Sequence, residues 1–322
     1  MELQLTIDAL KRAAPALETC DANETQFLQR ELTHLESTVY LDKEVELRHR
    51  QLIPVSNEGG PGLQSVNYQT VTKHGQAKII GSHTTAIPKS GFFVQEFTKR
   101  VYNIADSFGV TQRELRSSRR SSVPLQTTKA SAMRRAIRKL ESTIAFTGDT
   151  TYNIIGLLNN PNITQVVAPL NGGASSRLWE DKTAAEILAD VSLIAETVIT
   201  QSKEVHRPTT LVLPTQRKLV LGRTRTGSSS DRTLLDFILT NRDSFGISEI
   251  TTLPTELDTA FSGTAGALCY EKDPENLTLH IPMEMILHPP QRDGLDVEVI
   301  AEEEIAGTVV RYPLAFAILT GI

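Results

Sequence analysis

Clustered acidic side chains are the first feature of this sequence that could bind a metal ion or act in catalysis. Glu302, Glu303 and Glu304 form an uninterrupted acidic triplet between two predicted strands. Such a run is more often a solvated loop than a cation site, because a metal site or an acid–base pair needs converging partners from other segments. Asp149 follows a predicted helix and also lacks a partner that the sequence identifies. We therefore expect no metal site and no cofactor.

The other residue types used in catalysis are dispersed along the chain. The sequence has no phosphate-binding loop, no dinucleotide fingerprint, no Gly-x-Ser-x-Gly turn and no His-Glu-x-x-His motif. The seven histidines are scattered, and the two cysteines, Cys20 and Cys269, are too few for a disulfide framework. These observations favour a protein that is not an enzyme. A hydrolase with an unfamiliar site is the alternative, and it requires clustered polar residues in a deep pocket.

Positive charge is concentrated in one stretch of the chain. Nine lysines and arginines lie between Arg113 and Lys139, and only Glu114 and Glu141 oppose them nearby. No aromatic residues interleave with these cations, which argues against base stacking. Two interpretations stay open: ion pairing between subunits, which we favour, and sequence-independent proximity to DNA phosphates. The contact candidates in this stretch are Arg134, Arg135, Arg138 and Lys139.

Size and composition indicate an ordinary globular protein. The chain has 322 residues and a mass of 35.5 kDa, with 39% hydrophobic and 22% charged residues, which suits one large domain or two joined ones. No apolar run of about 18 residues appears, so we expect no membrane span. The formal net charge of −5 argues against a tight DNA binder such as a repressor. It does not exclude a container that encloses DNA.

Helical periodicity predicts two long helices. In residues 127–147, Met133, Ile137, Leu140 and Ile144 follow the i, i+4, i+7, i+11 rhythm of one apolar face. A second long helix begins after a capping box at residues 183–186. Short helices are predicted at 111–115, 215–221 and 230–240, and strands at 210–214, 249–252, 267–271, 277–281, 295–300, 307–311 and 314–319. Helices and strands mix without regular βαβ alternation, which predicts an α+β fold.

A polar hairpin is predicted before the first long helix. Residues 66–72 and 77–80 are rich in β-forming residues and flank a turn that contains Gly75. A two-stranded hairpin with polar faces is barely stable alone in water, so we expect it to lie against something outside its own fold. Its contact candidates are Tyr68, Lys73, His74, Gly75 and Lys78.

The order of these features resembles the major capsid proteins of tailed bacteriophages, in the branch whose fold is shared with encapsulins. The resemblance covers residues 45–322. The motifs that carry it are Thr111-Gln-Arg-Glu114-Leu115, Phe146-Thr-Gly-Asp149, Gly156-Leu-Leu-Asn-Asn-Pro161, Trp179-Glu-Asp-Lys-Thr183 and Pro208-Thr-Thr-Leu-Val-Leu-Pro214.

The resemblance implies a subunit with named parts. These are an N-terminal arm at 1–45, which includes a predicted amphipathic helix at 24–37; a peripheral domain at 46–164, with an extended loop at about 56–88 and a spine helix at about 127–147; an axial domain at 165–290; and strands at 291–322 that return to the peripheral domain.

The same resemblance implies a function in assembly. The subunit would form hexamers and pentamers of an icosahedral phage head around double-stranded DNA, in the host cytoplasm, with portal and scaffolding proteins as partners and no membrane contact. Closed rings of this kind use heterologous contacts between different surfaces of one chain. An encapsulin-type compartment around a cargo enzyme is the alternative with the same fold.

Overall fold

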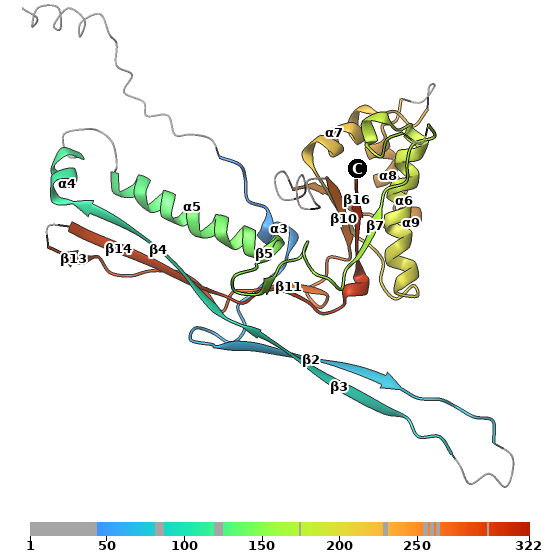
Figure 1. The fold of residues 1–322 in the computed structure, drawn as a ribbon, viewed down its shortest axis with the longest axis horizontal. Helices are drawn as coiled ribbons and strands as arrows, with labels where there is room; N and C mark the ends of the chain where they lie inside the picture. The colour runs from blue at the N-terminus through green and yellow to red at the C-terminus, as the bar shows by residue number, and fades with distance from the viewer. Residues whose placement is uncertain are drawn as a thin grey trace, which may run out of the picture. The chain divides into compact units, whose positions relative to one another are not determined.

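The computed structural model describes residues 44–80, 87–118, 125–173, 175–227, 231–253, 257, 261, 265–294 and 296–322. The chain divides by its internal contacts into two units, Met1–Val45 and Glu46–Ile322, and the second is shown in colour in Figure 1. The predicted arm helix and Cys20 lie outside the described residues.

One layer of the second unit is a sheet covered by a long helix. The central strand β14 pairs along its whole length with β4 on one side, and with β12 and β13 on the other. Helix α5 packs on this sheet through Met133 and Ile137, against Ile104, Ala301 and Ile305. The elements of this layer are β4 (Tyr102–Thr111), β12 (Met283–Leu287), β13 (Gln291–Asp293), β14 (Asp296–Ile305), α4 (Gln112–Ser118) and α5 (Leu125–Phe146).

A second sheet carries apolar residues on both faces. Its strand order is β7-β16-β10-β8-β9. Ile318 belongs to the same core as α5, whereas its neighbour Leu319 belongs to a core shared with helices α6 and α8. The two cores therefore meet at this sheet. Its elements are β7 (Thr164–Val167), β8 (Thr210–Leu213), β9 (Glu249–Thr252), β10 (Gly266–Tyr270), β16 (Phe316–Thr320), α6 (Ala184–Gln201), α7 (Thr215–Arg223), α8 (Leu234–Thr240) and α9 (Arg242–Phe245).

Short elements connect these layers. Strand β11 pairs with β1 and β15 in a three-stranded sheet, and β5 pairs with β6 after α5. Gly148 begins β5 with φ of +74°, the left-handed geometry expected at the end of the helix. The short elements are α3 (His49–Leu52), β1 (Val55–Ser56), β5 (Gly148–Asp149), β6 (Ile154–Ile155), β11 (Leu277–His280), β15 (Gly307–Val310), η1 (Trp179–Asp181) and η2 (Pro313–Ala315).

The predicted local signals for helices are confirmed. Thr111 and Glu114 form reciprocal side-chain to backbone hydrogen bonds. Thr183 and Glu186 do the same at the start of α6. Both long helices and the α+β mixture agree with the sequence-based expectation, and Cys269 is buried.

The predicted hairpin is present, but the prediction of where its second strand lies was wrong. Strand β2 (Ser65–His74) pairs in register with β3 (Gly91–Arg100), not with residues 77–80. We call the paired strands the ribbon. The turn signal near Gly75 suggested a tight connection, yet Phe92, Phe93 and Val94 are stronger strand formers and take the pairing positions. The hairpin therefore ends at Arg100, beyond the boundary of about 88 predicted for the extended loop.

Three further expectations were wrong. The acidic triplet lies inside β14 and not in a solvated loop, and Glu303 and Glu304 are buried. Leu140 is 43% exposed, and Glu141 takes its place on the buried face of α5. The last strand, β16, joins the sheet of β8 and β10 instead of returning to β4 and β14, because its residues are apolar on both faces and fit only between two cores.

Candidate inter-subunit surfaces

The ribbon is an exposed surface with aromatic side chains. None of the twenty residues of β2 and β3 is buried. On one face, Tyr68 stacks on Phe97 with ring centroids 5.1 Å apart, and His74 stacks on Phe93 at 4.8 Å. Phe92, on the other face, and Phe93 are 67% and 69% exposed. The expectation of two polar faces was therefore wrong, since β3 contributes aromatic residues that residues 77–80 lack.

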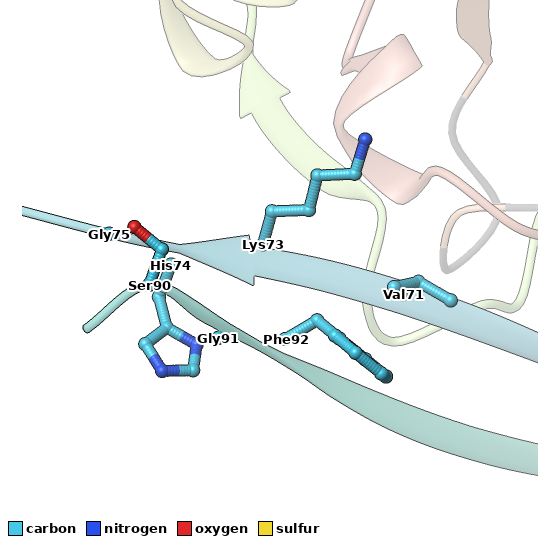
Figure 2. A pocket seen from close by; sticks show the side chains of 7 residues that line it. All are labelled: Val71, Lys73, His74, Gly75, Ser90, Gly91 and Phe92. Atoms are coloured by element: carbon cyan, nitrogen blue, oxygen red, sulfur yellow. The ribbon is translucent and has the colours of Figure 1, made fainter.

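The end of the ribbon forms an open depression, shown in Figure 2. Gly91 stands opposite His74, and a side chain at Gly91 would place Cβ only 2.9 Å from the imidazole ring. The glycine thus leaves room for His74 to lie across the partner strand. The depression is lined by Val71, Lys73, His74, Gly75, Ser90, Gly91 and Phe92.

The hairpin contact candidates lie along the ribbon and at its exposed end. Tyr68 is half-buried within the ribbon, whereas Lys73, His74 and Gly75 line the depression, and Lys78 is exposed beyond it. Aromatic side chains this exposed are costly in a monomer and typical of an interaction surface. Their contact with another subunit stays a prediction.

The basic stretch divides into two kinds of residue. Arg134 and Lys139 are exposed on α5, and Arg135 is half-buried. Arg138 pairs within its own chain, with Nη1 at 2.9 Å from Glu141 Oε2 and Nη2 at 3.6 Å from Glu284 Oε2. Arg138 is therefore engaged in its own subunit, and Arg134 and Lys139 are the more accessible of these candidates.

A cluster of charged residues beneath α5 was missed by the sequence analysis. Arg50 Nε lies 2.7 Å from Glu141 Oε1, and its Nη1 lies 2.8 Å from Glu284 Oε1. His49 Nε2 lies 3.1 Å from Glu141 Oε1, and Arg50 Nη2 lies 3.4 Å from Glu303 Oε1. The carboxylates of Glu141 and Glu303 are fully buried. The charge cluster consists of His49, Arg50, Arg138, Glu141, Glu284 and Glu303.

The two buried carboxyls of the charge cluster differ in acidity. Burial alone would raise the pKa of Glu141, but the close approach of His49 and the hydrogen bonds from Arg50 outweigh it and lower the pKa to about 2. Burial raises the pKa of Glu303 to about 7, and the Glu141 carboxylate adds to this rise. Glu141 follows Ile137 by four residues and precedes Ile144 by three. A carboxylate on an apolar helical face was the signal that could have revealed the cluster.

Within the described residues, no group of three or more His, Cys, Asp or Glu side chains is arranged to hold a metal ion. In the same part of the chain, no helix is both long and apolar enough to cross a lipid bilayer.

Comparison with protein families identifies the family of this chain. The family model described as major capsid protein matches residues 75–322, from the end of the ribbon to the last residue. The chain belongs to the major capsid protein family. The resemblance to major capsid proteins drawn from the sequence is thereby confirmed, and the protein is a capsid subunit. A search of the curated proteins gives no match.

Solved structures share the fold of this capsid protein at low sequence identity. The capsid of Myoviridae phage XM1 matches with a TM-score of 0.79 at 18% identity, covering 91% of this chain and 98% of that one. Microbacterium phage Oxtober96 gives a TM-score of 0.63 at 11% identity, covering 91% and 97%. A virus-like particle from Pyrococcus furiosus gives 0.50 at 16% identity, covering 84% and 90%. The predicted α+β capsid fold is confirmed.

Proposed function

We propose that this capsid protein assembles into hexamers and pentamers of an icosahedral head that encloses double-stranded DNA, with the ribbon lying across a neighbouring copy. The observation that carries the proposal is the exposure of aromatic residues on both faces of the ribbon. A hairpin without a covering layer is marginally stable, and a second copy of the chain supplies the missing layer. Many such contacts, each weak, stabilise a closed shell.

Further parts of the proposal rest on the resemblance to tailed-phage capsid proteins. It supports assembly in the host cytoplasm with separate scaffolding and portal proteins. It also supports the division into an arm at 1–45, a peripheral domain at 46–164, an axial domain at 165–290 and C-terminal strands at 291–322, of which β16 joins the sheet of the axial part. An encapsulin-type compartment shares the fold, and the contents of purified shells, nucleic acid or a cargo enzyme, distinguish the two.

Replacing Phe92 and Phe93 together by serine is expected to prevent assembly without unfolding the subunit. Covering a phenylalanine contributes about 1.5–3 kcal/mol, so the two losses raise the concentration needed for assembly at least about a hundredfold. Sedimentation and electron microscopy at matched concentrations measure the effect. Gln95→Ser, an exposed polar position on the same strand, is the control. Normal shells from the double variant would contradict a role of the ribbon in assembly.

The cationic face of α5 is open to two interpretations, ion pairing between subunits and proximity to the enclosed DNA, and its exposed cations allow the second to be tested. Arg134 and Lys139 are exposed and form no ion pair within the described residues, and the only acid of this helix, Glu141, is buried. Because phosphate contacts release counterions, replacing both cations by glutamine is expected to reduce the slope of log affinity against log salt by about 2. Fluorescence anisotropy with duplex DNA measures that slope. Arg223→Gln, an exposed cation on α7, is the control, and an unchanged slope in R134Q/K139Q would assign this face to protein contacts instead.

A further inference from the structure

The ribbon is joined to the rest of the chain by two connections. The segment that leads into β2 contains Gly59, Gly60 and Gly62, all with φ between +71° and +97°. Glycine adopts these angles without steric cost and can also leave them easily. On the other side, β3 continues through Val101 into β4. The ribbon therefore leaves the body through a glycine turn on one strand and a continuous backbone on the other.

One buried carboxylate fixes the glycine turn. The backbone N–H of Gly62 donates to both carboxylate oxygens of Glu304, each at 3.0 Å. Glu304 is 7% exposed on β14, and no lysine, arginine or histidine of the described residues forms an ion pair with it. A buried carboxylate needs a donor, so this charge-assisted hydrogen bond holds the turn in a single position.

The outgoing strand is anchored separately. The Tyr102 hydroxyl donates to the carbonyl oxygen of Tyr152 at 3.0 Å, and the two rings are 5.5 Å apart. The N–H of Val101 donates to the carbonyl oxygen of Gln64 at 3.0 Å, which ties the two connections together. The hydrogen bonds between Gly62 and Glu304 tie the incoming connection to β14 in the same way.

A small change in the direction of the ribbon produces a large displacement of its far end. Ten residues of extended strand span about 33 Å, so a rotation of about 10° at the base moves the far end by about 6 Å. In pre-organised complexes the interface backbone differs by only about 1 Å between the free and bound states, so a shift of about 6 Å is large by comparison. A small loss of order at the base is therefore enough to misplace the exposed aromatic residues.

We propose that Glu304 is a positioning residue that sets the direction of the ribbon and thereby the curvature of the assembled shell. The inference rests on the proposed function of the ribbon as an inter-subunit contact. It differs from a merely structural role of Glu304, which would change the stability of the subunit and leave the geometry of any shell unchanged.

The test compares Glu304→Gln with Glu302→Gln. Both residues lie on β14 and point to the same face, but Glu302 pairs with His288 at 3.0 Å, and among the described residues it forms no hydrogen bond with the turn that contains Gly62. We expect E304Q subunits to melt within a few degrees of the wild type, yet to give at least tenfold fewer shells of wild-type diameter, with open or irregular particles in their place. E302Q is expected to assemble like the wild type. Cryo-electron microscopy measures diameter and closure, and thermal unfolding of dissociated subunits measures stability.

A second variant tests the turn without touching β14. A side chain at Gly62 meets no atom within 4 Å, so Gly62→Ala opposes only the positive φ of the turn. It is expected to reproduce the assembly defect of E304Q. Gly294→Ala, between β13 and β14, is the matched control, since it is equally open and has φ of +58°.

The outcomes separate the two proposals. Shells of unchanged yield and diameter from E304Q and G62A, together with loss of assembly in the Phe92 and Phe93 variant, overturn the role of Glu304 and leave the ribbon contact standing. Normal assembly of the Phe92 and Phe93 variant overturns the ribbon contact itself. An E304Q subunit that does not fold, with normal shells from G62A, also overturns the positioning role.

Discussion

Replacing Glu141 by glutamine is expected to lower the free energy of unfolding of the dissociated subunit by about 3 kcal/mol. The change keeps the side-chain volume but leaves Arg50 and Arg138 without their shared buried counterion. Removing one partner of a buried ion pair typically costs about 3–5 kcal/mol. The lower end applies because Arg50 and Arg138 keep 27% and 29% of their side chains exposed and regain some hydration.

Glu284→Gln is the matched control for this prediction. Glu284 binds the same two arginines, but its side chain is 41% exposed. Exposed ion pairs contribute about 0–1 kcal/mol, so this variant is expected to unfold almost as the wild type does. Urea unfolding of dilute, unassembled subunits measures both. Equal losses in E141Q and E284Q would show that burial of the Glu141 carboxylate does not govern the strength of the charge cluster.

The stability of the subunit is expected to fall as pH rises from about 4.5 to about 7, through Glu303. Burial is the main cause of its pKa of about 7, Glu141 and Glu284 raise it further, and Arg138 and Arg50 lower it. In the unfolded chain the same carboxyl ionises near pH 4.5. Between these pH values the carboxyl keeps its proton in the folded state and loses it in the unfolded chain. Lowering the pH within this range therefore favours the folded state, and raising it favours unfolding. Over the whole range from pH 4.5 to 7, the free energy of unfolding is expected to fall by about 3 kcal/mol.

Glu303→Gln isolates this contribution. Glutamine resembles the protonated carboxyl and does not titrate, so the difference between the wild-type and E303Q free energies of unfolding should change by about 3 kcal/mol across that window. The wild type should lose stability relative to E303Q as pH rises. The measurement is urea unfolding of unassembled subunits at pH 4.5, 5.5, 6.5 and 7.5. If the free energies of unfolding of the two proteins change in parallel with pH, Glu303 does not hold a proton in the folded state over this range.

Local sequence patterns determined the helices and the fold class. The apolar rhythm of α5 and the capping boxes at Thr111 and Thr183 involve residues three to four positions apart, so they can be recognised without knowledge of the rest of the fold. The absence of βαβ alternation was visible for the same reason. The order of these elements, with motifs such as Trp179-Glu-Asp-Lys-Thr183, was also sufficient for the resemblance that the family match confirmed.

Only the tertiary structure decided which strands pair and which charges are buried. The partner of β2 is β3, across a connection whose length no local turn signal specifies. The charge cluster joins Arg50 to Glu284 and Glu303, which lie 234 and 253 residues further along the chain. Pairing and desolvation depend on groups distant in sequence, whereas periodicity and capping depend on near neighbours. The sequence therefore determined that a ribbon and a long cationic helix exist, and the fold decided where the ribbon's aromatic residues point and which carboxylates lose their water.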